Sequence, residues 1–283
     1  MKLPINITLL ASWLFLTTVA LTAVLITPAN ANSAEAINPV KPADNELSIQ
    51  INQQLYNYKF ANQALADADP KVKPVAPRLS DVLAPVALTE KWYWPVAALY
   101  NSSDNTALLL QQQLLDQLAA LQQTHATDTK LHEALSAMTK QVQAWQLASR
   151  IFIPIDYDLA RAKAKYNPRF TAGQYLLRLA TRPSQVTVFG LVAQPGKIMH
   201  KNTADVAEYV ADLSYLAAAD SNTLYIVQPN GAVITTTVAA WQQQRFEAMP
   251  GAQLFVPFKS GLFSAKWQQL NQDILMLARH RVL

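Results

Sequence analysis

The stretch QVTVFGLV, residues 185–192, decides how the second half of this chain folds. Valine, threonine and phenylalanine dominate it, and these residue types favour β-strands. The pair Pro195-Gly196 follows and predicts a tight turn. Farther along, Pro229-Asn230-Gly231 predicts a hairpin turn between strands expected at residues 224–227 and 233–238.

A helix and a last strand complete this region. Apolar residues recur at helical spacing within residues 203–215. The pair Pro250-Gly251 precedes a strand expected at 254–258. Residues 184–258 therefore predict the order β-β-α-β-β-β, a small mixed sheet crossed by one helix.

The first half of the chain predicts strands that are farther apart. Residues 46–51 and 54–60 alternate apolar and polar side chains and predict a hairpin. Two more strands are expected at 151–155 and 174–179. A short helix is expected at 79–84, where Pro85 stops it.

Residues 101–150 predict an inserted pair of helices. Two apolar stripes in this segment step by three or four residues, the spacing of one helix face. A seven-residue connection, 123–129, separates them and offers Thr129 as an N-cap. We expect two antiparallel helices that pack stripe to stripe. The stripes are Ala107, Leu110, Leu114, Leu118 and Leu121, and then Leu131, Leu135, Met138, Val142 and Trp145.

A C-terminal amphipathic helix is expected at residues 264–279. Trp267, Leu270, Ile274 and Leu277 form one apolar stripe, which must be buried somewhere. A helix of this length is ~24 Å long, which is shorter than the ~30 Å hydrocarbon core of a bilayer. We therefore expect the stripe to dock on its own domain or on a partner protein, in preference to membrane insertion.

The first 31 residues resemble a secretory signal peptide. Lys2 precedes an apolar run at residues 5–26, and Pro28 and the small-residue site Ala29-Asn30-Ala31 follow it. An uncleaved membrane anchor is the alternative, because about 20 apolar residues suffice to span a bilayer. We expect cleavage after Ala31, a leader at residues 32–45 and a periplasmic location.

Composition excludes several classes of protein. The chain has no cysteine, which excludes disulfides and thiolate nucleophiles. All six glycines lie between Gly173 and Gly261, and no phosphate-binding glycine loop or nucleophile elbow can be written. A net charge of +4 is too small to indicate nucleic-acid binding. We expect no metal and no cofactor, because the four histidines fall in different predicted elements (His125, His132, His200 and His280).

Several motifs, in order along the chain, resemble the GfcC-like capsule biosynthesis proteins, the family of group 4 (O-antigen) capsules. The clearest is RPSQVTVFGLVAQPG at residues 182–196. The others are RLSDVL (78–83), YWP (93–95), IDYDLAR (155–161), YIVQPNG (225–231), Trp241 and MPGAQLFVPF (249–258).

This resemblance implies an α+β protein with two β-grasp domains, which are ubiquitin-like and related to the soluble-ligand-binding β-grasp (SLBB) domains of outer-membrane polysaccharide exporters. The first domain would span residues 46–182 and contain the helical hairpin, and the second would span 183–260. The terminal helix, 261–283, would correspond to that of the exporters. The implied role is non-enzymatic work in the periplasm on a capsular or other surface polysaccharide. Implied partners are the polysaccharide and an outer-membrane exporter or other export proteins.

A glycan site is expected where arginines and tryptophans gather in the first domain. Guanidinium groups grip sugar carboxylates, and aromatic faces stack on sugar rings. The alternative is that the tryptophans fill the seam between the first domain and the hairpin. The candidate residues are Arg78, Trp92, Trp94, Arg150, Asp158 and Arg161.

The runner-up interpretation is a polysaccharide-modifying enzyme. Asp156 and Asp158 are two residues apart and would point to one side of an extended segment, as a pair of hydrolytic carboxylates requires. The preferred structural interpretation is that Asp158 caps the following turn or pairs with Arg161. We therefore expect no catalytic residues.

Overall fold

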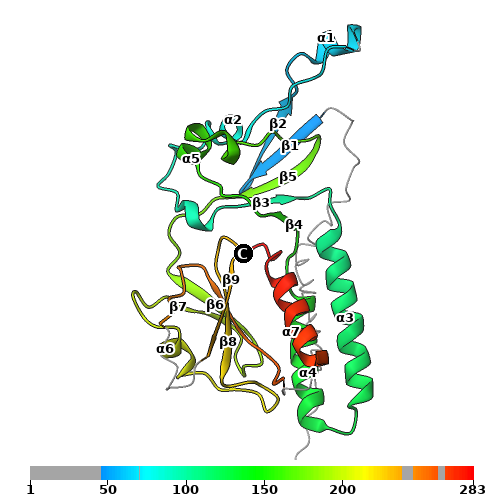
Figure 1. Ribbon diagram of the computed structural model, residues 1–283, viewed down its shortest axis with the longest axis vertical. Coiled ribbons are helices and arrows are strands. Elements are labelled where there is room, and N and C mark those ends of the chain that lie inside the picture. The colour runs from blue at the N-terminus through cyan, green and yellow to red at the C-terminus, as the bar shows by residue number, and fades with distance from the viewer. Residues whose placement is uncertain (1–45, 70, 238–244, 261–264) are drawn as a thin grey trace, which may run out of the picture. The chain divides into compact units, whose positions relative to one another are not determined.

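The computed structural model describes residues 46–69, 71–237, 245–260 and 265–283, all within the unit Pro39–Leu283. The signal peptide predicted at 1–31, the leader at 32–45 and Trp241 lie outside the described residues. The described residues form two five-stranded mixed sheets and several helices (Figure 1). The predicted α+β class with two β-grasp-like sheets is confirmed. No helix in these ranges is long and apolar enough to span a bilayer.

The first sheet has the strand order β2-β1-β5-β3-β4. The parallel pair in it is β1 with β5, and the other neighbours are antiparallel. The predicted hairpin of β1 and β2 is confirmed. The strands are β1 (Glu46–Ile51), β2 (Gln54–Lys59), β3 (Ala98–Asn101), β4 (Ser149–Ile151) and β5 (Gly173–Arg178).

Two strands of this sheet differ from the sequence expectation. The sequence does not predict β3, because only five residues separate the end of the aromatic run at 92–95 from the helical segment predicted at 101–150. The strand expected at 151–155 lies earlier, at β4. Pro154 has no N–H to donate to a ladder, and Asp156 already caps the next helix by accepting the Leu159 N–H at 2.8 Å.

One face of the first sheet carries a closed core. Burial alternates strictly along β5, so Tyr175 and Leu177 point inward while Leu176 and Arg178 point to the opposite face. The inward face packs against short helices and turns. These are α2 (Leu79–Leu83), α5 (Tyr157–Ala162) and the 3-10 turn Trp94–Val96; α1 (Gln63–Ala68) and the 3-10 turn Ala164–Tyr166 complete this half.

The second sheet has the order β7-β6-β10-β8-β9, again with one parallel pair, β10 with β6. It contains the strands predicted around QVTVFGLV. The helix expected at 203–215 is only α6 (Ala207–Val210), because Tyr215 leaves the helical path to form a β-bridge with Val192. The strands are β6 (Gln185–Gly190), β7 (Gly196–Met199), β8 (Thr223–Val227), β9 (Val233–Thr237) and β10 (Gln253–Val256).

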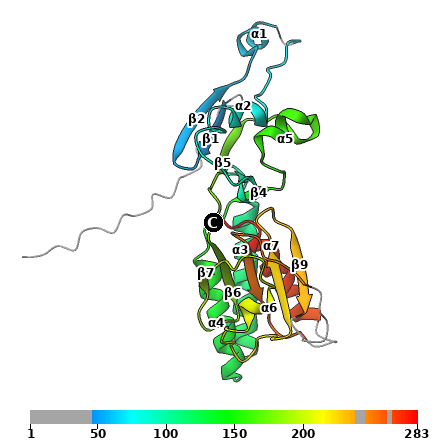
Figure 2. The same cartoon turned by 90° about the vertical axis from the view of Figure 1, so that its left-hand side faces the viewer.

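The helical segment comprises α3 (Thr106–Thr124) and α4 (Thr129–Gln143). Its apolar stripes join the core of the second sheet, although the segment is inserted between strands of the first (Figure 2). The Gln141 side chain fixes this contact by hydrogen bonds of 2.9 Å to both the N–H and the carbonyl of Gly190. The N-cap of α4 is Asp128, not Thr129, since its carboxylate accepts the Leu131 N–H.

Helix α7 (Ala265–Ala278) packs on the same core. Leu270, Ile274 and Leu277 are fully buried, and Trp267 stacks on Phe258 with ring centroids 5.3 Å apart. Self-docking is therefore what the structure shows. Trp267 is only half-buried, and a partner role for this helix stays a prediction.

Candidate functional site

The structure does not bring the six predicted glycan-binding residues together. Trp92 and Trp94 pack against the core of the first sheet, and the Trp92 indole donates to the Val86 carbonyl at 2.8 Å. The Arg78 guanidinium donates to the Asn167 carbonyl at 2.9 Å. The tryptophans therefore pack against the first sheet itself and do not fill a seam between that sheet and the helical hairpin.

Asp158 and Arg161 also differ from the expectation. The carboxylate that caps α5 belongs to Asp156, and Asp158 occupies the exposed first turn of the helix. Arg161 lies over the Tyr157 ring, 5.4 Å from its centroid. Among the contacts of the described residues, no ion pair joins Asp158 to Arg161.

Of the six, Arg150 lines a cavity between the two sheets, while Trp92 lines a separate cavity of about 490 Å³ beside β1 and β2. The cavity between the sheets holds about 450 Å³ and draws its walls from both of them. Ala98, Tyr100, Arg150 and Arg178 come from the face of the first sheet that points away from its core.

The opposite wall is a row of polar side chains on the second sheet. Thr187 of β6 pairs with Lys197 on one neighbouring strand and with Gln253 on the other, so all three project from the same face. The peptide between the sheets, Leu179–Ser184, and the C-terminal residues Arg281 and Leu283 complete the walls. We call this cavity the basic pocket and define it by Arg150, Arg178, Lys197, Gln253 and Arg281.

Two of its cations are held rigidly. Arg281 donates to the Gln253 amide oxygen at 2.7 Å and lies over the Trp145 ring, 4.6 Å from its centroid. Arg150 donates to the Pro229 carbonyl, while its Nε is buried without a partner among the described residues. Burial lowers the pKa of Arg281 to about 10 and also lowers the pKa of Arg150. Both guanidinium groups are thus poorly solvated but still charged at neutral pH.

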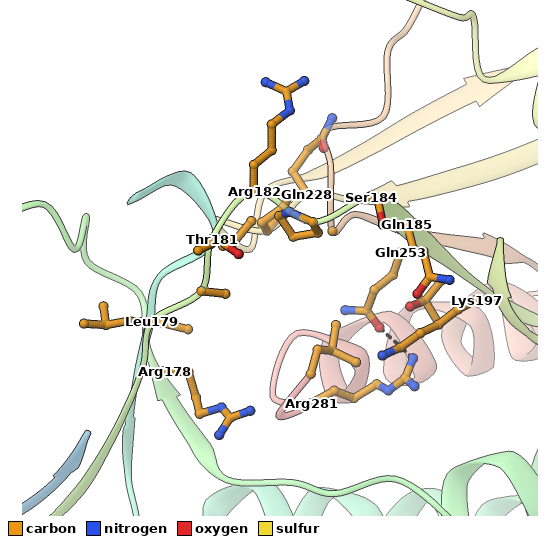
Figure 3. Close-up of a pocket in the computed structure, with 18 of the residues that line it drawn as sticks. Arg178, Leu179, Thr181, Arg182, Ser184, Gln185, Lys197, Gln228, Gln253 and Arg281 are labelled. Atoms are coloured by element: carbon orange, nitrogen blue, oxygen red, sulfur yellow. Dashed lines mark hydrogen bonds between the residues drawn. The ribbon is translucent and has the colours of Figure 1, made fainter. Parts of the chain in front are cut away.

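The other two cations, Arg178 and Lys197, are available to a ligand. Neither Arg178 nor Lys197 has a hydrogen-bonding or ion-pairing partner for its side chain in the part of the chain that the structure describes. Figure 3 shows Arg178 entering the pocket from the first sheet and Lys197 and Arg281 entering from the opposite side, while Arg182 points away. No aspartate or glutamate of the described ranges lines the pocket.

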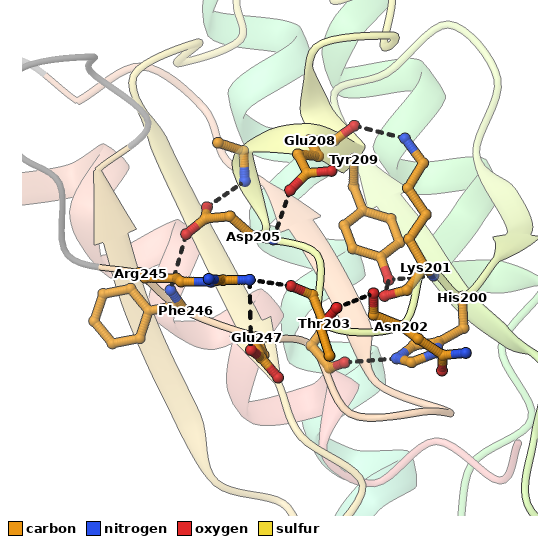
Figure 4. Close-up of polar contacts among 12 residues, drawn as sticks. His200, Lys201, Asn202, Thr203, Asp205, Glu208, Tyr209, Arg245, Phe246 and Glu247 are labelled. Atoms are coloured by element: carbon orange, nitrogen blue, oxygen red, sulfur yellow. Dashed lines mark hydrogen bonds and ion pairs between the residues drawn. The ribbon is translucent and has the colours of Figure 1, made fainter.

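A second polar region lies on the second sheet beside α6 (Figure 4). The Asp205 carboxylate accepts the N–H groups of Ala207 at 2.8 Å and Phe246 at 3.2 Å. Glu208 accepts the Asp205 N–H at 3.1 Å. These carboxylates hold the start of α6 against the segment around Phe246.

The cations of this region are engaged as well. Lys201 donates to the Glu208 carbonyl at 2.8 Å. Arg245 donates to the Thr203 carbonyl and lies 3.9 Å from Glu247. We call Lys201, Asp205, Glu208, Arg245 and Glu247 the α6 network. Most of its charged side chains are held by hydrogen bonds to the backbone, and we therefore interpret it as a structural feature.

The arrangement of the basic pocket suits binding of an anion. Guanidinium and ammonium groups without carboxylate partners attract carboxylates and phosphates. Among the residues that the structure describes, no group of three or more histidine, aspartate or glutamate side chains is placed to hold a metal ion.

Comparison with known proteins identifies the family. Residues 67–182 match the family described as "Capsule biosynthesis GfcC, N-terminal", and residues 194–283 match "Capsule biosynthesis GfcC C-terminal". The chain belongs to the GfcC capsule biosynthesis family. The "Uncharacterized protein YjbG" of Escherichia coli (strain K12) is 34% identical over 208 residues, which cover 73% of this chain and 83% of that protein.

The basic pocket draws on both matched regions of this GfcC-family chain. Arg150 and Arg178 belong to the N-terminal region, and Lys197, Gln253 and Arg281 belong to the C-terminal one. Sequence reasoning missed four of these five residues. The available signal was the outward position of Arg178 in a strand whose alternate residues are apolar.

Proposed function

We propose that this protein is a periplasmic, non-catalytic component of surface-polysaccharide assembly or export, and that it binds the glycan in the basic pocket. Membership of a capsule biosynthesis family supports the polysaccharide. The observation that carries the binding role is a cavity of about 450 Å³ whose cations lack carboxylate partners among the described residues. That volume lies within the ~300–1,000 Å³ typical of small-molecule sites.

A non-catalytic role agrees with how the candidate carboxylates are used. Glycoside hydrolysis needs two carboxyl groups on either side of the scissile bond. Asp156 is occupied as the N-cap of α5, and neither it nor Asp158 lines the basic pocket. The hydrolase interpretation therefore has no geometry to support it in the described residues.

The periplasmic location is supported by the N-terminal sequence, where a basic start, an apolar run and Ala29-Asn30-Ala31 occur in the order of a signal peptide. We expect the mature protein to begin at Asn32 and to be released by osmotic shock. Full-length chain that stays in membranes after carbonate washing would contradict this location.

A cellular experiment tests the role as a whole. Deleting the gene in its host should reduce polysaccharide at the cell surface and increase the amount retained inside. Wild-type protein should restore export, and the double variant R178Q/K197Q should not. The matched control is K140Q/K266Q, which removes two exposed cations outside the pocket. Normal surface polysaccharide in the deletion strain would refute the proposal.

A partner of the export machinery, such as an outer-membrane exporter, is the second element of the proposal. A pure adaptor would bind that partner without affinity for sugar. Isothermal titration of the purified protein with oligosaccharides from the host's own polysaccharide separates the two roles.

A further inference from the structure

We propose that the basic pocket selects an anionic sugar residue, one that carries a carboxylate or phosphate group. This inference rests on the proposed glycan-binding function and specifies its substrate class. It starts from a charge imbalance, since Arg150, Arg178, Lys197 and Arg281 line one cavity with no side-chain carboxylate of the described residues beside them. Leu283 also lines the cavity, and its terminal carboxylate forms no ion pair with these cations.

The imbalance is unusual because two of these four charges are not freely hydrated. Arg150 and Arg281 are only partly exposed, and the buried Nε of Arg150 lacks a partner in the described part of the chain. A buried charge that is not paired destabilises a protein strongly. A bound anion would offset this cost, because it would give these guanidinium groups a partner of opposite charge.

The cations enter the pocket from two opposite sides, and we call this arrangement a clamp. Arg178 reaches in from the first sheet, while Lys197 and Arg281 reach in from the second sheet and the C-terminal segment (Figure 3). Contacts with Gln253 and Trp145 hold the Arg281 guanidinium in place. Arg178 therefore faces Lys197 and the preorganised Arg281 across the cavity, an arrangement that favours an anionic group between them.

The remaining walls indicate a sugar and not an inorganic anion. A free phosphate ion would leave much of a 450 Å³ cavity empty. The other lining groups are hydroxyls and amides that suit sugar hydroxyls, together with a few apolar side chains that suit a ring face. They include Tyr100, Thr181, Ser184, Gln185, Thr187 and Leu179.

Binding measurements with chemically edited glycans test the selection. Oligosaccharides are prepared from the host's own surface polysaccharide in three forms: native, carboxyl-reduced and dephosphorylated. We expect the native form to bind and one of the edited forms to bind at least tenfold more weakly, which identifies carboxylate or phosphate as the recognised group. The variants R178Q and K197Q should each weaken binding of the native form by about tenfold or more. The exposed-site control K140Q should bind like wild type.

The possible outcomes separate the two proposals. Equal binding of all three forms, with binding lost in R178Q/K197Q, would overturn anion selection and leave the glycan-binding function standing. A polysaccharide without carboxylate or phosphate groups would do the same. Failure of every form to bind the folded protein would overturn the glycan-binding function itself. Inorganic phosphate that binds as tightly as the native oligosaccharide would show a simple anion site and overturn the sugar.

Discussion

The basic pocket, between the two sheets, and the α6 network, on the second sheet (Figure 4), show two different uses of charge. In the α6 network, the carboxylates of Asp205 and Glu208 accept backbone N–H groups, and Lys201 and Arg245 donate to backbone carbonyls. In the basic pocket, Arg178 and Lys197 have no such partners among the described residues. Charges of the first kind hold the fold, while charges of the second kind remain available to a ligand. Substitutions in the two regions should therefore change different measured quantities.

The largest expected effect is on binding in R178E, which reverses the charge of one clamp residue. Affinity for the native host oligosaccharide should fall by about 100-fold or more, because a contact to a charged group worth about 1.5–3 kcal/mol becomes a repulsion. The free energy of unfolding should stay the same or rise, since the new carboxylate faces the other pocket cations. Titration calorimetry and urea unfolding measure the two effects. The control is K140E, an exposed charge reversal in the last turn of α4, which should leave the affinity unchanged and lower the free energy of unfolding by at most about 1 kcal/mol. An R178E protein that binds normally would remove the distinction between the regions.

The substitution D205A should have the opposite pattern. It removes an acceptor of two backbone N–H groups, at 2.8 and 3.2 Å. Hydrogen bonds to charged groups contribute about 1.5–3 kcal/mol each when buried, and partial exposure of Asp205 reduces this, so we expect a loss of about 2 kcal/mol in the free energy of unfolding. Affinity for the oligosaccharide should not change. Weaker binding by folded D205A would show that the α6 network contributes to the site.

The sequence predicts the strands and helices well where periodicity is local. QVTVFGLV, the 46–60 hairpin and the helical stripes each indicate their own structure. Where an element differs from its prediction, contacts between distant parts of the chain set its bounds. The helix expected at 203–215 shrinks to α6 because Val206 donates to the Phe246 carbonyl and Tyr215 bridges to Val192, and neither contact can be read from local spacing.

The sequence predicted the chemistry of the candidate site but not which residues form it. An arginine-rich site was expected, and Arg150 does line the basic pocket. The tryptophans were expected in the same cleft as the arginines, but they are half-buried against the core of the first sheet, away from the basic pocket. The pocket depends on which strands are neighbours, because Thr187 aligns Lys197 with Gln253 only through the pairing of β6 with β7 and β10. A single sequence carries no direct signal for such pairing.

A third prediction concerns the segment that closes the basic pocket. The Nδ1 atom of His280 accepts the Arg150 N–H at 3.0 Å, which requires a neutral ring. Burial lowers the pKa of His280; the charges of Arg279 and Arg150 act in the same direction, and a backbone hydrogen bond at Ala148 and the charge of Asp104 oppose them. The folded state therefore binds fewer protons than the unfolded state. Its stability should be intact above about pH 6.5, the ordinary histidine value, and should fall as the pH drops toward the folded pKa.

Urea unfolding between pH 4.5 and 8 measures this dependence, with H280N as the comparison. The asparagine oxygen can accept the same N–H without taking up a proton, so the acid-dependent loss should be smaller in H280N than in wild type. Identical pH dependence in the two proteins would exclude His280 as the origin. The charges of the α6 network lie on separate elements and should contribute equally to both proteins.

The smallest expected effect is the loss of stability when an exposed ion pair made by Lys201 of the α6 network is removed. Lys201 and Asp212 are 3.6 Å apart, but their side chains are 45% and 83% exposed. Water and salt screen such pairs, and measured contributions are about 0.2–1 kcal/mol. We expect D212A to lower the free energy of unfolding by less than about 0.5 kcal/mol and 0.5 M NaCl to abolish the difference. D205A should keep most of its larger loss at that salt concentration, because its effect comes from backbone hydrogen bonds and not from a screened ion pair. If D212A were as destabilising as D205A, the stability of the α6 region would depend on ion pairing. The contrast with the basic pocket would then come from where the charges lie, and not from whether they have hydrogen-bonding partners.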